Sequence, residues 1–249
     1  MSDEDLFNGR RAVVTGAGRG IGRGIALDLA LGGASVVALS RSASDLESLV
    51  DEAAPLTGEL TAVAADVRDT AALEVIFDEA AADLLVTAAG INRPGPLVDT
   101  CVEDLTAVLE TNVMGTLLAC RAFGKSALAA GRSGAVVTLS SQMGAVGYPG
   151  RAAYCASKHA INGLTKALAV EWARQRIRVN AVAPTFIRTP LTAEFLADPE
   201  FEAEVLERIP LGFIGEVQDV TGAVRYLLSD AARLVTGHIL NVDGGWTAW

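Results

Sequence analysis

Short apolar runs alternate along this chain with longer stretches in which apolar residues recur every three or four positions. The short runs are rich in Val and Leu, which is typical of strands buried on both faces of a parallel sheet. We expect strands at Ala12–Thr15, Ser35–Leu39, Leu60–Ala65, Leu84–Thr87, Ala135–Leu139, Arg178–Ala183 and Ile239–Val242. The alternation therefore predicts an α/β fold in which helices cover both faces of one parallel sheet.

The stretches between the strands show helical periodicity. The first helix is marked by apolar residues that fall one turn apart, Ile21, Ile25 and Leu29. Gly32 and Gly33 follow it as a stop signal. Long helices rich in Ala and Leu are expected within Val102–Ala130 and Tyr154–Gln175. In a sheet of this kind the ligand is expected at the carboxyl ends of the strands.

No internal repeat or Pro/Ser-rich linker divides the 249 residues, so we expect a single domain over residues 1–249. From Leu73 to the strand at Leu84 there is room only for a helix and a tight turn. Between Pro190 and Pro210 the helical pattern weakens, with Pro199 in the middle. Because this stretch follows a strand end, it predicts a small lid segment near residues 190–210.

Charge and cysteine usage narrow the class of partner and the compartment. The formal net charge of −10 disfavours nucleic acid and anionic membrane surfaces as partners. The odd number of cysteines (Cys101, Cys120 and Cys155), with no CxxC pair, favours a reducing compartment. The acidic start of the chain is unlike a signal peptide, and no apolar run approaches the length of a membrane helix. We therefore expect a cytoplasmic protein.

A glycine-rich loop, Thr15–Gly22, links the first strand to the first helix. Its glycines allow the backbone to approach a pyrophosphate, and the helix start offers free N–H groups, so the loop predicts dinucleotide binding. The second strand ends in Leu39–Ser42 without the Asp or Glu that commonly holds the ribose hydroxyls of NAD. Ser40, Arg41 and the loop residue Arg19 instead favour a 2′-phosphate. NADP(H) is favoured, and NAD(H) stays open.

Tyr154 and Lys158 lie one helical turn apart, so their side chains share one face of a helix. A lysine cation is expected to lower the pKa of the phenol and make it a usable proton donor or acceptor. Ser141, at the end of the preceding strand, is a second candidate donor to a substrate oxygen. Asn112 is an amide that can hold a water. Asp66, after the third strand, can accept from an adenine amino group.

Together these residues and their order resemble the classical short-chain dehydrogenase/reductase family, from about residue 9 to Gly245. The resemblance implies a single Rossmann-type domain with a seven-stranded parallel sheet, no metal, and assembly as a homotetramer through the two long helices. It also implies Tyr154 as general acid and base, assisted by Lys158, Ser141 and Asn112. The cofactor would be held by Gly16, Arg19, Gly20, Ile21, Ser40, Arg41, Asp66, Val67, Ala89, Gly90, Tyr154, Lys158, Pro184, Ile187 and Thr189.

Two departures from the family's usual sequence lie near the site. The family commonly has Asn-Asn-Ala-Gly where this chain has Thr87–Gly90, and Pro-Gly where it has Pro184-Thr185. Neither touches the proton-transfer groups, so activity is still expected.

The substrate is the least determined part. Residues just after strand ends or near the catalytic groups are candidates to bind it: Arg93, Gln142, Arg151, Phe186 and Arg188. An inward-pointing arginine would indicate a carboxylate, as in a sugar acid. Three functions stay open: a dehydrogenase of polar hydroxy or keto compounds, a 3-oxoacyl thioester reductase, and a nucleotide-sensing protein without catalysis.

Overall fold

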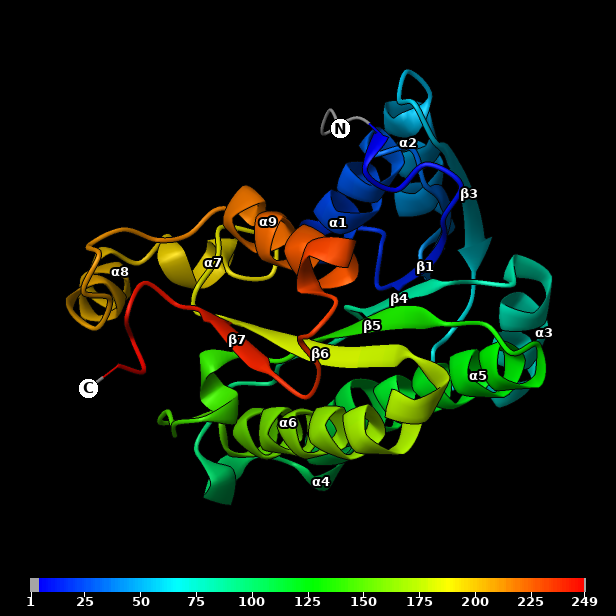
Figure 1. The fold of residues 1–249 in the computed structure, drawn as a ribbon. Coiled ribbons are helices and arrows are strands. Elements are labelled where there is room, and N and C mark those ends of the chain that lie inside the picture. The colour runs from blue at the N-terminus through cyan, green and yellow to red at the C-terminus, as the bar shows by residue number, and fades with distance from the viewer. Residues whose placement is uncertain (1–4, 249) are drawn as a thin grey trace.

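A computed structural model describes residues 5–248. Residues 1–4, which belong to the acidic start of the chain, and residue 249 lie outside this range. Seven strands form one parallel sheet in the order β3-β2-β1-β4-β5-β6-β7 (Figure 1). They are β1 (Arg11–Thr15), β2 (Ser35–Ser40), β3 (Glu59–Ala64), β4 (Leu84–Thr87), β5 (Gly134–Leu139), β6 (Ile177–Pro184) and β7 (Ile239–Val242). The predicted doubly wound α/β fold is confirmed, with each strand within one residue of its expected ends.

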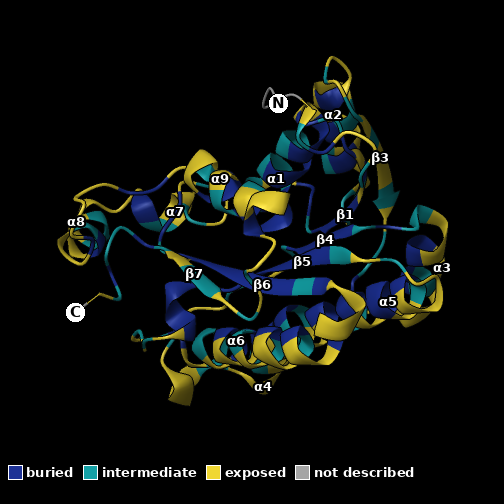
Figure 2. Ribbon diagram, in the orientation of Figure 1, coloured by how far each residue is buried: buried dark blue, intermediate teal, exposed yellow. Residues whose placement is uncertain are grey.

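Helices cover both faces of the sheet (Figure 1). One face carries α1 (Gly20–Leu31), α2 (Ala43–Ala53) and α9 (Val217–Leu228); the other carries α3 (Thr70–Ala80), α4 (Val102–Leu109), α5 (Gly115–Ala129) and α6 (Ala152–Trp172). Two buried clusters fill the interfaces, and they include Ile25 and Val224 on the first face and Phe123 on the second. The central strands are buried and the edge strands β3 and β7 are more exposed (Figure 2), as expected where helices cover both faces.

The expected helix over Val102–Ala130 is interrupted. A π-helical turn, Glu110–Met114, separates α4 from α5 and carries Asn112 at its centre. Such turns are frequently found at functional sites. The predicted tight connection before β4 is confirmed by α3, which Asp69 caps by accepting from Ala72 N.

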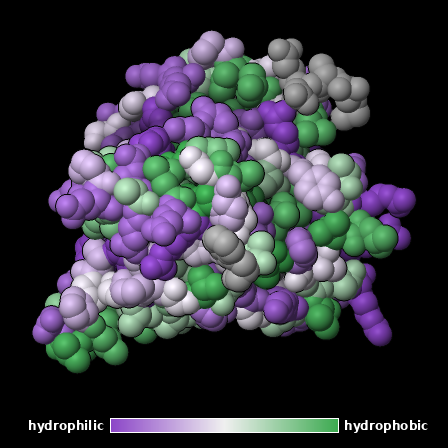
Figure 3. All heavy atoms as spheres, turned by 90° about the vertical axis from the view of Figure 1, so that its left-hand side faces the viewer, coloured by the Kyte–Doolittle hydropathy of each residue, from purple (hydrophilic) through white to green (hydrophobic). Residues whose placement is uncertain are grey.

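The segment near residues 190–210 forms two short helices, α7 (Ala193–Leu196) and α8 (Pro199–Glu207), beside the carboxyl ends of β6 and β7 (Figure 1). Asp198 caps α8, and Pro199 is its first residue, a position where the missing N–H of proline costs nothing. A third buried cluster joins this segment to the sheet through Phe186, Val205 and Trp246. On the face in Figure 3, hydrophilic and hydrophobic side chains are interspersed.

Within residues 5–248, no helix has both the length and the apolar character needed to cross a membrane.

Candidate active site

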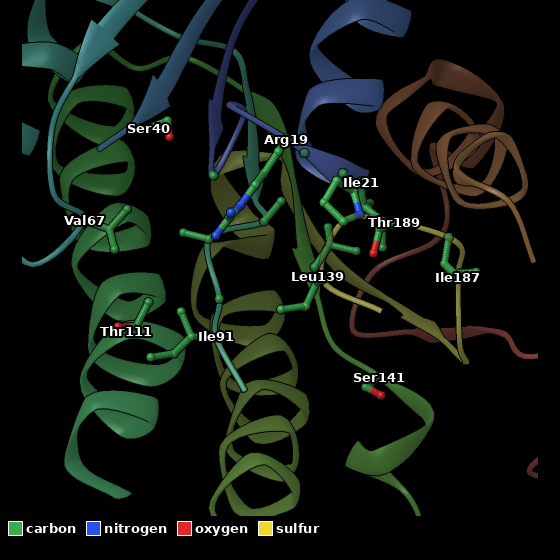
Figure 4. A pocket seen from close by; sticks show the side chains of 18 of the residues that line it. Arg19, Ile21, Ser40, Val67, Ile91, Thr111, Leu139, Ser141, Ile187 and Thr189 are labelled. Carbon is green, nitrogen blue, oxygen red and sulfur yellow. The ribbon is translucent and has the colours of Figure 1, made fainter. Parts of the chain in front are cut away.

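The chain reverses its direction of winding between β1 and β4, which are neighbours at the centre of the sheet. In sheets of this type the ligand crevice lies outside the carboxyl ends of the strands at that point. A cavity is present there, and every residue predicted to bind the cofactor lines it. Figure 4 shows Val67, Ile91 and Thr111 on one side of Arg19, and Ile21, Thr189 and Ile187 on the other.

The glycine-rich loop fits closely between the ends of β1 and β4. Gly16 has φ +69°, and a Cβ there would lie 2.6 Å from the backbone nitrogen of Ala89. Gly20 has φ +57°, also in the left-handed region that favours glycine. A Cβ on Gly18 would lie 2.7 Å from Ser40 Oγ. The backbone can therefore approach a ligand at this loop without side chains between them.

The start of α1 and two guanidinium groups together make this loop suited to phosphate. Arg19 is the N-cap of α1 and makes no side-chain cap hydrogen bond, so the first N–H groups are open to an anion. Arg19 and Arg41 are both exposed. Among the described residues, neither guanidinium group has a hydrogen bond or an ion pair. The residues therefore fit a dinucleotide that carries an additional phosphate.

Asp66 is held by a neighbour at the predicted adenine end. Arg68 donates to it from its backbone and its side chain, with Nη2 at 2.7 Å from Oδ2. The Arg68 hydrogen bond holds the pKa of the Asp66 carboxyl below its usual range, so it is ionised at neutral pH. An ionised carboxylate can still accept a further hydrogen bond.

Tyr154 and Lys158 share one face of α6, which lies against the end of β5. Lys158 is buried, and its Nζ donates to the carbonyl oxygen of Leu139 at 2.7 Å. Nζ lies 5.4 Å from the centre of the Tyr154 ring. The Ser141 hydroxyl makes a hydrogen bond with the Tyr154 side chain and donates to Gln142 Oε1 at 2.6 Å. The predicted proton-transfer groups thus lie together at one end of the cavity.

Burial dominates the titration of both groups. It raises the pKa of Tyr154 to about 12, against the lowering effect of the Ser141 hydrogen bond, and it lowers the pKa of Lys158 to about 8. The expected lowering of the tyrosine pKa by Lys158 is therefore wrong for the protein alone. The reason is geometric: within the described residues Lys158 donates to a carbonyl and lies over the face of the ring, and no hydrogen bond joins it to the phenol oxygen.

Asn112 connects the end of β4 to α6. Its Oδ1 accepts from Ile91 N at 2.8 Å, and its Nδ2 donates to Ile91 O at 3.0 Å and to Ser157 Oγ at 3.1 Å. Because both amide hydrogens are used, a water at this side chain could only donate to Oδ1. The structure shows Asn112 holding two elements of the site together.

The candidate substrate arginines differ sharply in environment. Arg93 is exposed and paired with Asp104 at 3.2 Å, and Arg188 is exposed and paired with Glu202 at 2.6 Å. Arg151, in contrast, is 5% exposed, has no acidic partner within residues 5–248, and its buried Nη1 has no hydrogen-bond partner.

The Arg151 guanidinium lies between α7 and the start of α6. It stacks 4.9 Å from the centre of the Phe195 ring of α7. Burial lowers its pKa, and the neighbouring Tyr148 and Tyr154 oppose that effect. Gln142, also buried, contacts Ser141, while Phe186 lies in the cluster that packs against α7 and α8. Of the three arginines, only Arg151 is buried, and Tyr154 is among the groups that act on its pKa.

Sequence reasoning missed several residues of the site. Thr111, Leu191 and Thr192 also line the cavity. Their signal was proximity in the chain, because Thr111 directly precedes the predicted Asn112, and Leu191 and Thr192 lie two and three residues after the predicted Thr189. Tyr148 and Trp246 had no such signal. Their rings lie 6.1 Å apart, and the Tyr148 hydroxyl donates to Glu204 of α8 at 3.2 Å.

Comparisons with known proteins agree with this geometry. A family model described as enoyl-(acyl carrier protein) reductase matches residues 16–247. D-erythrulose reductase of Gallus gallus is 38% identical over 99% of each chain. Galactitol 2-dehydrogenase (L-tagatose-forming) of Cereibacter sphaeroides is 40% identical, over 98% of this chain and 97% of the relative. The chain belongs to the classical short-chain dehydrogenase/reductase family.

A solved structure of this family extends the likeness to the fold. Gluconate 5-dehydrogenase from Burkholderia cenocepacia J2315, in complex with NADP and tartrate, superposes with a TM-score of 0.91. It is 32% identical and covers 99% of this chain and 98% of its own. The protein is thus an oxidoreductase of the short-chain family that uses a nicotinamide cofactor and acts on a CH–OH group. This answers the question of class that the sequence left open.

Both departures from the family's usual sequence leave a polar atom without a partner. Thr87 Oγ1 and Thr185 Oγ1 are buried, and neither has a hydrogen-bond partner among the described residues. Thr87 stands where the family commonly has an asparagine. An unpartnered buried hydroxyl costs about 1–3 kcal/mol of stability. The departures therefore affect stability at the strand ends and leave Tyr154 and Lys158 in place.

Proposed function

We propose that this protein interconverts a secondary alcohol and a ketone on a polyhydroxylated substrate that carries a carboxylate, such as a sugar acid, with NADP(H) as its cofactor. The observation that carries the proposal is the buried, unpaired guanidinium of Arg151 beside Tyr154. A buried cation without a counter-charge is costly, and a carboxylate would supply the missing partner. The sugar and polyol substrates in the names of the relatives, and the tartrate bound to the solved relative, support the same class.

The chain's own residues supply the proton chemistry. A bound nicotinamide would supply the hydride chemistry at the carbon that bears the substrate oxygen. Tyr154 donates its hydroxyl proton to the substrate oxygen in reduction and takes a proton back in oxidation. Ser141 orients that oxygen with a hydrogen bond. The Lys158 ammonium, 5.4 Å from the centre of the Tyr154 ring, would act on the phenolate form by charge attraction, although burial dominates the pKa of Tyr154 in the protein alone. Asn112 keeps α6 in register with β4.

The cofactor preference rests on the open cations at the adenosine end. Arg19 and Arg41 would hold a 2′-phosphate, while Ser40 and Asp66 would meet the ribose and adenine. Gly16, Gly20, Ile21, Val67, Ala89, Gly90, Pro184, Ile187 and Thr189 would form the walls around the dinucleotide. NAD(H) lacks the phosphate and would leave both guanidinium groups without a partner. NADP(H) is therefore the preferred form.

The larger organisation is proposed on separate grounds. Residues 1–249 form one domain, and α7 with α8 acts as a lid over the substrate. A homotetramer would cover the exposed apolar side chains of Leu117, Leu128 and Val170 on α5 and α6. The compartment is the cytoplasm, as the absence of paired cysteines suggests.

The test is turnover with matched substrates. Purified protein with NADPH should reduce keto-sugar acids faster than the neutral ketoses of equal length. Tyr154→Phe should lower kcat by about 100- to 10,000-fold because the proton donor is lost. The affinity for NADPH, measured by fluorescence titration, should stay within about twofold. Rapid reduction of a 3-oxoacyl thioester with no turnover of keto-sugar acids would refute the proposal.

A further inference from the structure

Asn162 lies on α6 one turn after Lys158 and two turns after Tyr154, so the three polar side chains share one face. That face lies against the end of β5 and the loop that follows it. The proposed mechanism gives roles to Tyr154 and Lys158 and none to Asn162. Asn162 is half-buried, and its amide makes two hydrogen bonds to that loop.

Both ends of the Asn162 amide are assigned by chemistry. The carbonyl oxygen of Gly144 can only accept, so it is Nδ2 that faces it, donating at 2.8 Å. Oδ1 then faces Ser140, whose buried hydroxyl donates to it at 2.6 Å. The alternative acceptor for that hydroxyl, Lys158 O, is farther away at 3.4 Å. Asn162 therefore uses one group to bind the residue before Ser141 and the other to bind the loop three residues after it.

The loop touches the amide directly. A Cβ on Gly144 would lie 2.7 Å from Asn162 Nδ2 and 2.8 Å from Ser140 Oγ, so only glycine allows this approach. Between the two bonded points the chain makes a single 3-10 turn, Gln142–Gly144. Ser141 is its N-cap, and Ser141 Oγ accepts from Met143 N at 3.2 Å. The position of the Ser141 hydroxyl thus depends on a turn that is fixed at both ends by one side chain.

We propose that Asn162 is a positioning residue for the reaction: it holds the Ser140–Gly144 loop on α6 and so fixes Ser141 relative to Tyr154. The inference rests on the proposed function, because it requires Ser141 to act on the substrate oxygen. Misplacement of a catalytic group by about 1 Å can cost about 100-fold in rate. Removal of the amide should therefore lower kcat about 10- to 100-fold. NADPH binding should be unchanged, because the amide has no contact with the glycine-rich loop or with Arg19.

The experiment is a double-mutant cycle between Asn162→Leu and Ser141→Ala, with kcat measured for each of the four proteins. Leu has nearly the shape of Asn but cannot make either hydrogen bond. We expect Asn162→Leu to lower kcat in the wild-type background and to change it by less than about twofold once Ser141 is Ala. Asn8→Leu, the same substitution at an exposed position, should leave kcat unchanged. NADPH affinity and a thermal melt are recorded for every variant.

The outcomes separate the two proposals. If Ser141→Ala lowers kcat but Asn162→Leu causes equal losses in both backgrounds, the inference is overturned and the proposed function stands. If Ser141→Ala leaves kcat unchanged, the assigned role of Ser141 fails and this inference fails with it. Should Asn162→Leu not fold, Ser140→Ala takes its place in the same cycle. It removes one of the two bonds, so it should give a smaller loss in kcat that again vanishes in the Ser141→Ala background.

Discussion

Arg151 offers the sharpest test of the substrate class. Replacing it with Met keeps an unbranched side chain of similar length, and the thioether retains a favourable contact with the Phe195 ring. The substitution removes the charge that we assign to a substrate carboxylate. A hydrogen bond to a charged group contributes about 1.5–3 kcal/mol, so kcat/KM for a keto-sugar acid should fall by about 10- to 100-fold. For a neutral ketose it should change by less than about twofold.

The same substitution should not lower the stability of the protein. In the cofactor-free protein Arg151 is a desolvated cation with no acidic partner in the described chain, and burial lowers its pKa. Removing such a group relieves a desolvation penalty, partly offset by the loss of the cation–π attraction to Phe195, which is worth about 0.5–2 kcal/mol. The free energy of unfolding of Arg151→Met should therefore be equal to or above that of the wild type.

The assay is steady-state reduction of matched acidic and neutral ketoses with NADPH, together with urea unfolding. Arg93→Met is the matched control, because Arg93 is exposed and already paired with Asp104. It should leave kcat/KM for both substrates unchanged. The reasoning is refuted if Arg151→Met lowers kcat/KM equally for the acidic and the neutral substrate, or if it keeps wild-type kcat/KM for the acid.

Three further predictions follow from the same site. Burial lowers the pKa of Lys158 to about 8 from an ordinary 10.5, so between these pH values the unfolded chain holds more protons and the free energy of unfolding rises with pH, by up to about 3 kcal/mol. Urea unfolding at pH 7.5 and pH 10 should show this rise in the wild type and not in Lys158→Met. A stability difference between the two proteins that does not change with pH would contradict the prediction. Arg19→Gln and Arg41→Gln should each weaken NADPH binding about tenfold, or about 1.4 kcal/mol, close to what a hydrogen bond to a charged group contributes. The affinity for NADH should stay within about twofold. Equal losses of affinity for both cofactors in fluorescence titration would rule out a 2′-phosphate site. Thr87→Val should raise the free energy of unfolding by about 1 kcal/mol, because it removes a hydroxyl without a partner in the described chain. Thr165→Val should lower the free energy of unfolding, because it breaks the 2.8 Å hydrogen bond to Thr138. If both variants are less stable than the wild type, Thr87 has a partner and the prediction is wrong.

Elements set by local pattern were predicted closely. The strands follow from runs of Val and Leu, and their ends differ from expectation by at most one residue, as in β3, Glu59–Ala64 against Leu60–Ala65. The cofactor cavity was also predictable, because its residues lie at strand ends that a parallel sheet brings together. Pro199 was misleading, since it begins α8 although it interrupts the apolar pattern.

Features that depend on distant contacts were not predictable. The π-helical turn at Glu110–Met114 carries an Asn112 whose amide bonds Ile91, 21 positions away, and Ser157, 45 positions away. No local pattern contains those partners. Likewise the sequence could not choose among Arg93, Arg151 and Arg188, because what distinguishes Arg151 is its burial against Phe195 of α7. The tyrosine pKa was predicted in the wrong direction because spacing along a helix does not report how deeply a phenol is buried.

The strand order has a consequence for how this enzyme can change over time. Residues that we propose to meet the adenosine end come from the first third of the chain, at the ends of β1, β2 and β3, whereas those that we propose to meet the substrate follow β5 and β6. The two groups lie on opposite sides of the junction between β1 and β4. Mutations in the second half that spare its proposed cofactor residues, such as Lys158 and Ile187, can therefore alter which compound is converted while the adenosine end stays intact. This separation gives the scaffold room to acquire new specificities one half at a time.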